Sequence, residues 1–230
     1  MAFITKVQYQ PGFTWKDNDA RVFNLTSRFF HPSASIGLPF IKSKNPKVYT
    51  IYRIEAPIIG QSYPANKTLD AVGLGDIILL DAIVFKRTWG GLGIGPAFII
   101  PTMKPETISS RKWSTGLVFV VLNKKTKGLQ WGALLQQFFN FAGDSNKPNQ
   151  NFMLLQPILT KIFVGGTFVQ FSPTFNLNWS KNTFNIPVSI SLGKTFAKNL
   201  SMQACPEYVV SGPNKGDFII KFQINTMFLR

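Results

Sequence analysis

The stretch DFIIKFQINTMF, residues 217–228, decides the fold class. Its apolar side chains occupy alternating positions: Phe218, Ile220, Phe222, Ile224 and Phe228. Polar side chains fill gaps between them: Lys221, Gln223 and Asn225. Alternation with a period of two is typical of a β-strand that has one apolar face and one polar face. The apolar face points either into a protein core or into lipid, and the function of the chain depends on which.

The same period recurs along the whole chain, whereas an apolar stripe with helical spacing is not evident. The clearest examples are residues 167–179, 183–193 and 200–208. Alternation weakens in residues 76–85 and 113–123, where both faces are apolar. Turn residues divide the sequence into about twelve strands of about ten residues, near the length of a tilted membrane-spanning strand. The expected strands begin at Ala2, Asn24, Val48, Asp76, Trp89, Trp113, Leu129, Asn151, Thr167, Thr183, Leu200 and Asp217.

The connections between these strands favour a membrane barrel. Long polar segments such as GQSYPANKTLDAVGLG alternate with short ones such as KTKG. Long loops on one side and short turns on the other characterise outer-membrane barrels, and closure removes exposed sheet edges. The sequence therefore predicts an all-β, antiparallel, up-and-down transmembrane β-barrel of about twelve strands, with residues 1–230 as one domain. We expect it in the outer membrane of a Gram-negative cell.

Composition narrows the class of partner. The 230 residues include 25 Lys and Arg against 10 Asp and Glu, a net charge of +15, yet 45% are hydrophobic and 22 are Phe. The cations lie mostly in the breaks between strands, which argues against a nucleic-acid groove and favours lipid and lipopolysaccharide phosphates. The single Cys205 excludes a disulfide framework. The N-terminal MAFITKVQYQ has no secretory pattern, so either the protein stays inside the cell or this chain begins after a removed signal peptide.

Aromatic residues at the expected strand ends provide a second membrane signal. Such rings are typical of the lipid headgroup level. The interface candidates are Trp89, Trp113, Trp131, Trp179 and Phe228. The competing interpretation is a soluble basic β-sandwich that binds anionic ligands, in which alternation means apolar side chains inside and polar ones in water. A dry centre containing Phe175, Ile190 and Phe222 would favour that alternative.

Several motifs together resemble a known family. In sequence order they are VGLGDIILLDAIVF, WGGLGIGPAFIIPT, RKWSTGLVFVVL, WGALLQQFFNFAGDSN, NFMLLQPIL and SGPNKGDFIIKF. They resemble outer-membrane β-barrel proteins of the MetA-pathway of phenol degradation (putative transporter) family, over residues from about 49 to the C-terminus. The resemblance implies an outer-membrane barrel that moves small compounds, including hydrophobic or aromatic ones. It implies no catalytic residues.

Strand parity selects polar residues for the barrel interior. The candidates are Lys6, Arg53, Glu55, Asp81, Gln170, Asn176, Gln203, Glu207, Lys221, Gln223 and Asn225. They form either a polar constriction that selects solutes or ordinary pore-filling groups. Three cations facing three carboxylates predict a weak ion preference. Loops 60–75 and 102–112 are expected to narrow the opening.

A catalytic interpretation has little support in the sequence. The only histidine, His31, shares strand parity with Ser33 and Ser35, which leaves an outer-membrane hydrolase as an alternative. No cluster has metal-ligand spacing, and the glycine-rich runs do not match a phosphate-binding motif. We therefore expect no enzyme, no cofactor and no metal, but a channel or transporter for small molecules that acts by passive diffusion through a polar lumen. The sequence indicates neither the solute nor the oligomeric state.

Overall fold

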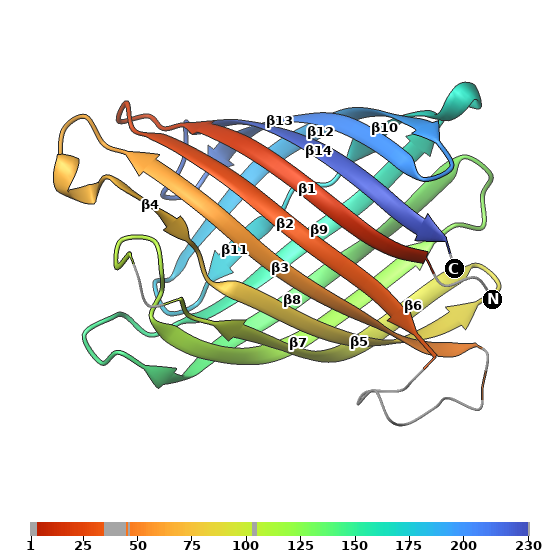
Figure 1. Ribbon diagram of the computed structural model, residues 1–230, viewed down its shortest axis with the longest axis horizontal. Helices are drawn as coiled ribbons and strands as arrows, with labels where there is room; N and C mark the ends of the chain where they lie inside the picture. The colour runs from red at the N-terminus through yellow and green to blue at the C-terminus, as the bar shows by residue number, and fades with distance from the viewer. Residues whose placement is uncertain (1–3, 35–44, 46, 103–104, 230) are drawn as a thin grey trace.

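The computed structural model describes residues 4–34, 45, 47–102 and 105–229, and these residues form a closed antiparallel β-barrel (Figure 1). The strands are β1 (Ile4–Trp15), β2 (Arg21–Ser33), β3 (Val48–Ser62), β4 (Ala71–Leu74), β5 (Ile77–Arg87), β6 (Gly90–Ile100), β7 (Lys112–Asn123), β8 (Leu129–Gly143), β9 (Asn151–Ile162), β10 (Thr167–Phe171), β11 (Phe175–Asn178), β12 (Thr183–Ala197), β13 (Leu200–Ser211) and β14 (Phe218–Leu229). Two short 3₁₀ helices, η1 (Lys67–Leu69) and η2 (Val164–Gly166), lie in connections. No helix among these residues is both long and apolar enough to cross a bilayer.

The ring has twelve positions. Neighbours in sequence pair with each other, and β1 pairs with β14 to close the sheet. Strands β10 and β11 both lie between β9 and β12, so they act as one strand that is interrupted at residues 172–174. Pro173 lies in this break, where its missing N–H cannot contribute to the ladder. β4 lies off the ring and pairs only with β3. The predicted antiparallel barrel of about twelve strands is confirmed.

Most expected strand starts agree with the structure to within one residue. The second strand begins at Arg21, three residues before the expected Asn24, and Ala2 lies outside the described residues. The segment 60–75, expected to be a loop, contains η1 and the extra strand β4. The four residues of β4 pair with the end of β3 and do not add a position to the ring.

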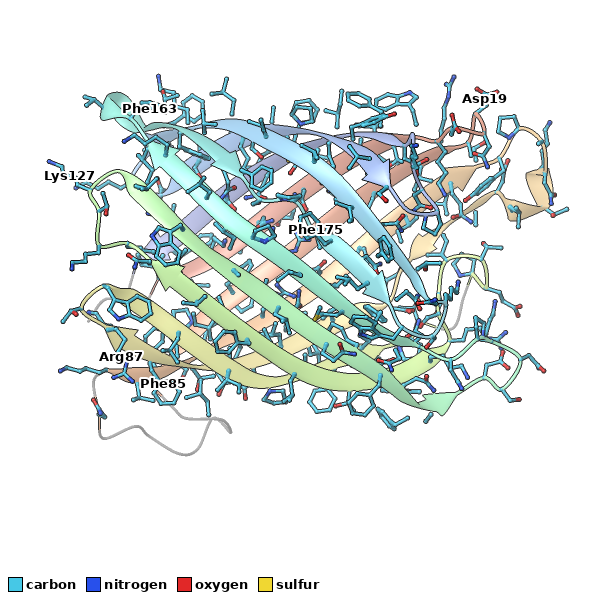
Figure 2. All side chains as sticks on the ribbon, turned by 180° about the vertical axis from the view of Figure 1, so that it is seen from behind. Asp19, Phe85, Arg87, Lys127, Phe163 and Phe175 are labelled. Carbon is cyan, nitrogen blue, oxygen red and sulfur yellow. The ribbon has the colours of Figure 1, made fainter. Side chains whose placement is uncertain are left out.

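The apolar faces of the strands point outward, which rules out the soluble sandwich. Phe222 and Ile190 are 47% and 58% exposed. Figure 2 places Phe175 on the barrel wall, and its partner Leu155 has the outward parity of β9. Exposed apolar side chains cover the wall continuously, as on a lipid-facing surface. The dry centre that would have supported the sandwich, with these three residues together, is not formed.

The interface aromatics lie at or near strand ends. Trp113, Trp131, Trp179 and Phe228 are between 42% and 52% exposed, whereas Trp89 lies half-buried in the turn between β5 and β6. Phe85 and Phe163 lie at the same end of the barrel as Arg87 and Lys127, and Asp19 marks the opposite end (Figure 2). β1 begins and β14 ends at the end with the short turns (Figure 1). We call these the turn end and the loop end.

The interior face of β5–β9 is largely apolar. Leu80, Ala82 and Val118 form one buried cluster against Leu134. A second cluster contains Ala97, Ile99, Phe138, Ile78, Phe152 and Leu154. These side chains explain why alternation is weak in residues 76–85 and 113–123, since those strands are apolar toward the lumen as well as outside. One side of the lumen is therefore lined mainly by apolar side chains.

Candidate functional site: a polar cavity in the barrel lumen

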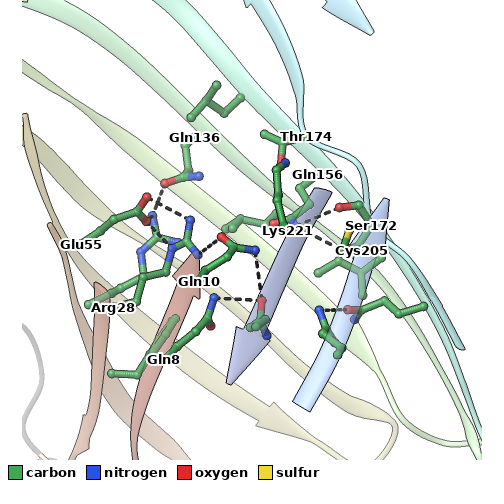
Figure 3. A pocket seen from close by; sticks show the side chains of 18 of the residues that line it. Gln8, Gln10, Arg28, Glu55, Gln136, Gln156, Ser172, Thr174, Cys205 and Lys221 are labelled. Carbon is green, nitrogen blue, oxygen red and sulfur yellow. Dashed lines mark hydrogen bonds and ion pairs between the residues drawn. The ribbon is translucent and has the colours of Figure 1, made fainter. Parts of the chain in front are cut away.

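A cavity of about 420 Å³ lies inside the barrel (Figure 3). Its polar lining comes from β1–β3, β8–β10, β13 and β14 and from the break between β10 and β11. Polar and charged groups line much of it: Lys6, Gln8, Gln10, Arg28, Arg53, Glu55, Gln136, Gln156, Gln170, Ser172, Thr174, Gln203, Glu207, Lys221 and Gln223. Phe30, Ile78, Leu134, Leu154, Ile158 and the lone Cys205 complete the lining. The cavity is large enough for a small organic molecule.

An arginine–glutamate cluster forms the charged centre of the cavity. Glu55 accepts two hydrogen bonds from Arg28, from Nε at 2.7 Å and from Nη2 at 3.1 Å. Arg28 also donates from Nη1 to Gln10 at 2.6 Å (Figure 3). Arg53 Nη2 lies 3.7 Å from the same carboxylate. One carboxylate is thus shared by two guanidinium groups, and its bidentate contact fixes Arg28 on the cavity wall.

Arg53 also spans the barrel interior. Its Nη2 donates to Gln136 Oε1 at 2.6 Å, so the contact joins β3 to β8. Three ring strands, β5, β6 and β7, separate these two strands along the wall. Side chains of strands that are four positions apart on the ring cannot meet along the wall. The hydrogen bond between Arg53 and Gln136 therefore crosses the lumen. The cluster of Leu80, Ala82 and Val118 lies on the wall between these two strands, and Leu134 connects it to the cavity.

Amide side chains of the adjoining strands β1, β14 and β13 form a ladder beside the arginine–glutamate cluster. Gln223 Oε1 accepts from Gln8 at 3.0 Å and from Gln10 at 3.4 Å. Gln223 then donates to Asn225 at 3.1 Å, which donates to Ser201 at 3.2 Å. These groups satisfy one another while leaving polar atoms along the cavity surface. They give the wall both donors and acceptors at fixed positions.

The remaining charges leave the cavity cationic. Lys221 donates to Glu207 at 2.8 Å. Lys6 has no carboxylate partner among the described residues; its Nζ lies 3.5 Å from Gln8 Oε1 and 4.0 Å from the Phe30 ring centroid. The four cations Lys6, Arg28, Arg53 and Lys221 face the two carboxylates Glu55 and Glu207, so 4 − 2 gives a net charge of +2. This replaces the expected balance, which omitted Arg28 and counted Asp81.

The lumen assignment of Asp81 was wrong. On β5 the inward positions are even, because Ile78 lines the cavity and Leu80 and Ala82 belong to the interior cluster. Asp81 therefore points outward, where its partner across the strands is Tyr52. The alternation of β5 is weak because both of its faces are apolar. The carboxylate of Asp81 was therefore taken, wrongly, to mark the inner face.

Eight of the sequence candidates line the cavity: Lys6, Arg53, Glu55, Gln170, Gln203, Glu207, Lys221 and Gln223. Asn176 and Asn225 lie on the inward face of their strands but outside this cavity. Sequence reasoning missed Gln10, Arg28, Gln136 and Gln156, and it missed the apolar wall. A polar residue at an even position within an apolar strand, as in LLQQFF, was the available signal for Gln136.

Hydrogen bonds and an ion pair connect the described parts of the loops at the loop end. Asp76 accepts hydrogen bonds from Ser109 Oγ at 2.7 Å and from the Ser110 backbone N–H at 2.9 Å. This holds the described part of loop 101–111 against the end of β5, and Arg111 pairs with Asp144 of the next loop at 3.0 Å. Loops 60–75 and 102–112 were expected to narrow the opening, and Thr102 Oγ1 donates to Leu74 O at 2.7 Å to join them.

A third loop, 144–150, was not expected at the opening. Gln150 Oε1 accepts a hydrogen bond from Oγ of the inward-facing Ser114 at 2.9 Å. Lys112 Nζ donates to Asn149 Oδ1 at 3.4 Å. Ser114 is completely buried. The end of the β8–β9 loop therefore contacts the inner face of β7 at the loop end.

Charge is distributed unevenly between the two ends. Seven of the ten acidic residues lie at the loop end: Asp17, Asp19, Asp70, Asp76, Glu106, Asp144 and Asp217. Burial raises the pKa of Asp217, which precedes β14. Within the described ranges, no acidic residue lies near the turn end, whose cations are Lys47, Lys86, Arg87, Lys124, Lys125, Lys127, Lys161, Lys194 and Lys198. The turn end therefore has a positive potential that attracts anions.

His31 lies away from the cavity. It shares the outward parity of Phe29, against which its ring stacks at 6.2 Å, and its Nδ1 lies 3.0 Å from Thr5 Oγ1. Ser35 lies outside the described residues. Across residues 4–34, 45, 47–102 and 105–229, no group of three or more His, Cys, Asp or Glu could hold a metal ion.

Comparison with known proteins supports the fold. No protein-family model matches the sequence, and no curated protein matches it. Among solved structures, an outer membrane channel from Pseudomonas putida F1 has a TM-score of 0.71 at 13% identity, over 99% of this chain and 95% of that chain. The NanC porin gives 0.60 at 9% identity over 96% and 98% of the two chains. The KdgM porin gives 0.57 at 9% identity over 97% and 99%. At these identities the likeness concerns the fold, which is that of outer-membrane barrels.

Proposed function

We propose that the protein is an outer-membrane channel that passes small solutes by passive diffusion. The observation that supports this most strongly is a closed barrel with an apolar outer wall around a polar cavity of about 420 Å³. A soluble protein would bury those outward side chains, and a purely structural barrel would fill its interior. The similar folds of an outer membrane channel and two porins agree with this function.

The proposal includes the location and the family. Outer-membrane lipid and lipopolysaccharide would cover the apolar wall, with basic turn residues close to headgroup phosphates. The motifs between about residue 49 and the C-terminus support membership in the MetA-pathway of phenol degradation family. Transport of hydrophobic or aromatic compounds belongs to the same proposal, and the apolar wall formed by Leu134, Leu154 and Ile158 supports it.

The proposal assigns no catalytic step to the chain. His31 packs between Phe29 and Thr5 on the outward face, where it cannot reach a solute in the cavity. Exchange of His31 for Ala is therefore expected to leave solute flux unchanged. Loss of an esterase activity in this variant, measured on the folded protein, would support the hydrolase alternative.

The direct test is reconstitution into a planar bilayer and into liposomes. The folded barrel, verified by its altered migration when unheated, is expected to give discrete current steps in KCl. It is also expected to admit small uncharged solutes in a swelling assay. A folded, inserted barrel that shows neither current nor swelling would refute the channel function.

A further inference from the structure

The lumen cavity has two chemically different walls that face each other. One side is mostly apolar: Ile78, Leu134, Leu154 and Ile158 come from β5, β8 and β9, and Gln136 and Gln156 lie among them. The charged side comes from β1, β2, β3, β13 and β14, on the other part of the ring. A fully polar solute gains no binding free energy from the apolar side. A hydrocarbon leaves the polar groups of the charged side without hydrogen-bond partners. The pair of walls matches a molecule with one apolar part and one polar part.

The sign of the charge on that molecule follows from the cations. Two carboxylates serve four cations, and Lys6 is left with an amide oxygen at 3.5 Å and the face of Phe30. Lys6 also lies in the positive field of Arg28, Arg53 and Lys124. An anion placed beside its ammonium would relieve this repulsion and form a charge-assisted hydrogen bond. The basic turn end increases the local concentration of anions at one mouth of the same lumen.

We propose that the cavity binds small amphipathic monoanions, namely organic carboxylates with an apolar body about the size of one ring, with the carboxylate at Lys6 and the body against Leu154 and Ile158. This inference rests on the proposed channel function and names its solute class. Phe30 lies beside the proposed carboxylate position and provides an apolar contact next to the charge. The neutral analogue would lose the ammonium contact, and a small inorganic anion would lose the apolar one.

The test uses benzoate, benzamide and acetate as probes of the chloride current through the reconstituted protein. Benzoate is expected to block the current at concentrations about tenfold lower than either of the other two, because only benzoate makes both contacts. Lys6→Gln keeps a polar side chain and removes the charge, and it is expected to weaken the benzoate block about tenfold. Lys181→Gln removes a cation from the β11–β12 turn, outside the cavity, and is expected to leave the block unchanged.

The outcomes separate the two proposals. Equal block by benzoate and benzamide, or an undiminished block in Lys6→Gln, would overturn the solute class while the channel function stands. Benzoate binding to the folded protein in detergent, followed by saturation-transfer NMR, provides a readout that does not require conduction. Binding that depends on Lys6 without any current would support the site and refute the channel. Ile158→Ser is expected to weaken benzoate binding in the NMR measurement, and unchanged binding in this variant would refute the apolar half of the site.

Discussion

Removing the carboxylate of Glu55 should make the lumen more selective for anions. Glu55 accepts from Arg28 at 2.7 Å and lies 3.7 Å from Arg53, so Glu55→Gln leaves two guanidinium groups without their shared counter-charge. The net charge of the cavity then rises from 4 − 2 = +2 to 4 − 1 = +3. At about 6 Å from the ion path and an effective dielectric constant of about 80, one unit charge contributes about 0.7 kcal/mol. Chloride gains and potassium loses about threefold each, so the permeability ratio changes about tenfold.

The assay is the reversal potential across a planar bilayer with a KCl gradient. The wild type is expected to favour chloride moderately, and Glu55→Gln to shift the potential further toward the chloride value. The shift should shrink in concentrated salt, where charges are screened. Asp81→Asn is the matched control, because it removes a carboxylate of the outward face and should leave the potential unchanged. A shift in Asp81→Asn, or no shift in Glu55→Gln, would refute the placement of the two carboxylates.

Three further changes test the interior and the wall. Gln136→Leu removes the acceptor of the cross-lumen bridge to Arg53 and is expected to lower the free energy of unfolding by about 1–3 kcal/mol in a urea titration; an unchanged midpoint would show that the bridge contributes nothing. Gly95→Ala would place a Cβ 1.8 Å from the Asp81 carbonyl oxygen, so the fraction of refolded barrel on an unheated gel should fall, and wild-type refolding would contradict this close approach. Asp81→Leu removes a charge from the outer wall and should raise the free energy of unfolding in lipid by about 1–2 kcal/mol, whereas a loss of stability would indicate a structural role for the carboxylate.

Strand parity predicted the fold well because the barrel wall separates two solvents. Where one face meets lipid and the other a polar lumen, as in β14, most residues indicate which side they face, and Phe222 and Gln223 show the phase of the alternation. The same rule failed on β5. Leu80 and Ala82 face the lumen but are as apolar as their outward neighbours, and Asp81, the one polar residue in the run 77–85, lies on the outer face.

The charged centre of the cavity could be predicted only in part. Arg53 and Glu55 are two residues apart on one strand, so their shared face was visible in the sequence. Their partners Arg28 and Gln136 come from other strands, and no local pattern shows which residues meet across a closed ring. The apolar wall was hidden for a related reason, because inward and outward apolar residues look alike in a sequence.

The most direct test of the account is the solvent exposure of successive residues on β14 in lipid. Cys205→Ser gives a background without cysteine, into which single cysteines at Lys221, Phe222, Gln223 and Ile224 can be introduced and spin-labelled. Labels at Phe222 and Ile224 are expected to collide with oxygen dissolved in the bilayer, and labels at Lys221 and Gln223 with a water-soluble relaxation reagent. The opposite phase, or the same exposure at all four positions, would contradict a barrel with lipid outside and a polar lumen within.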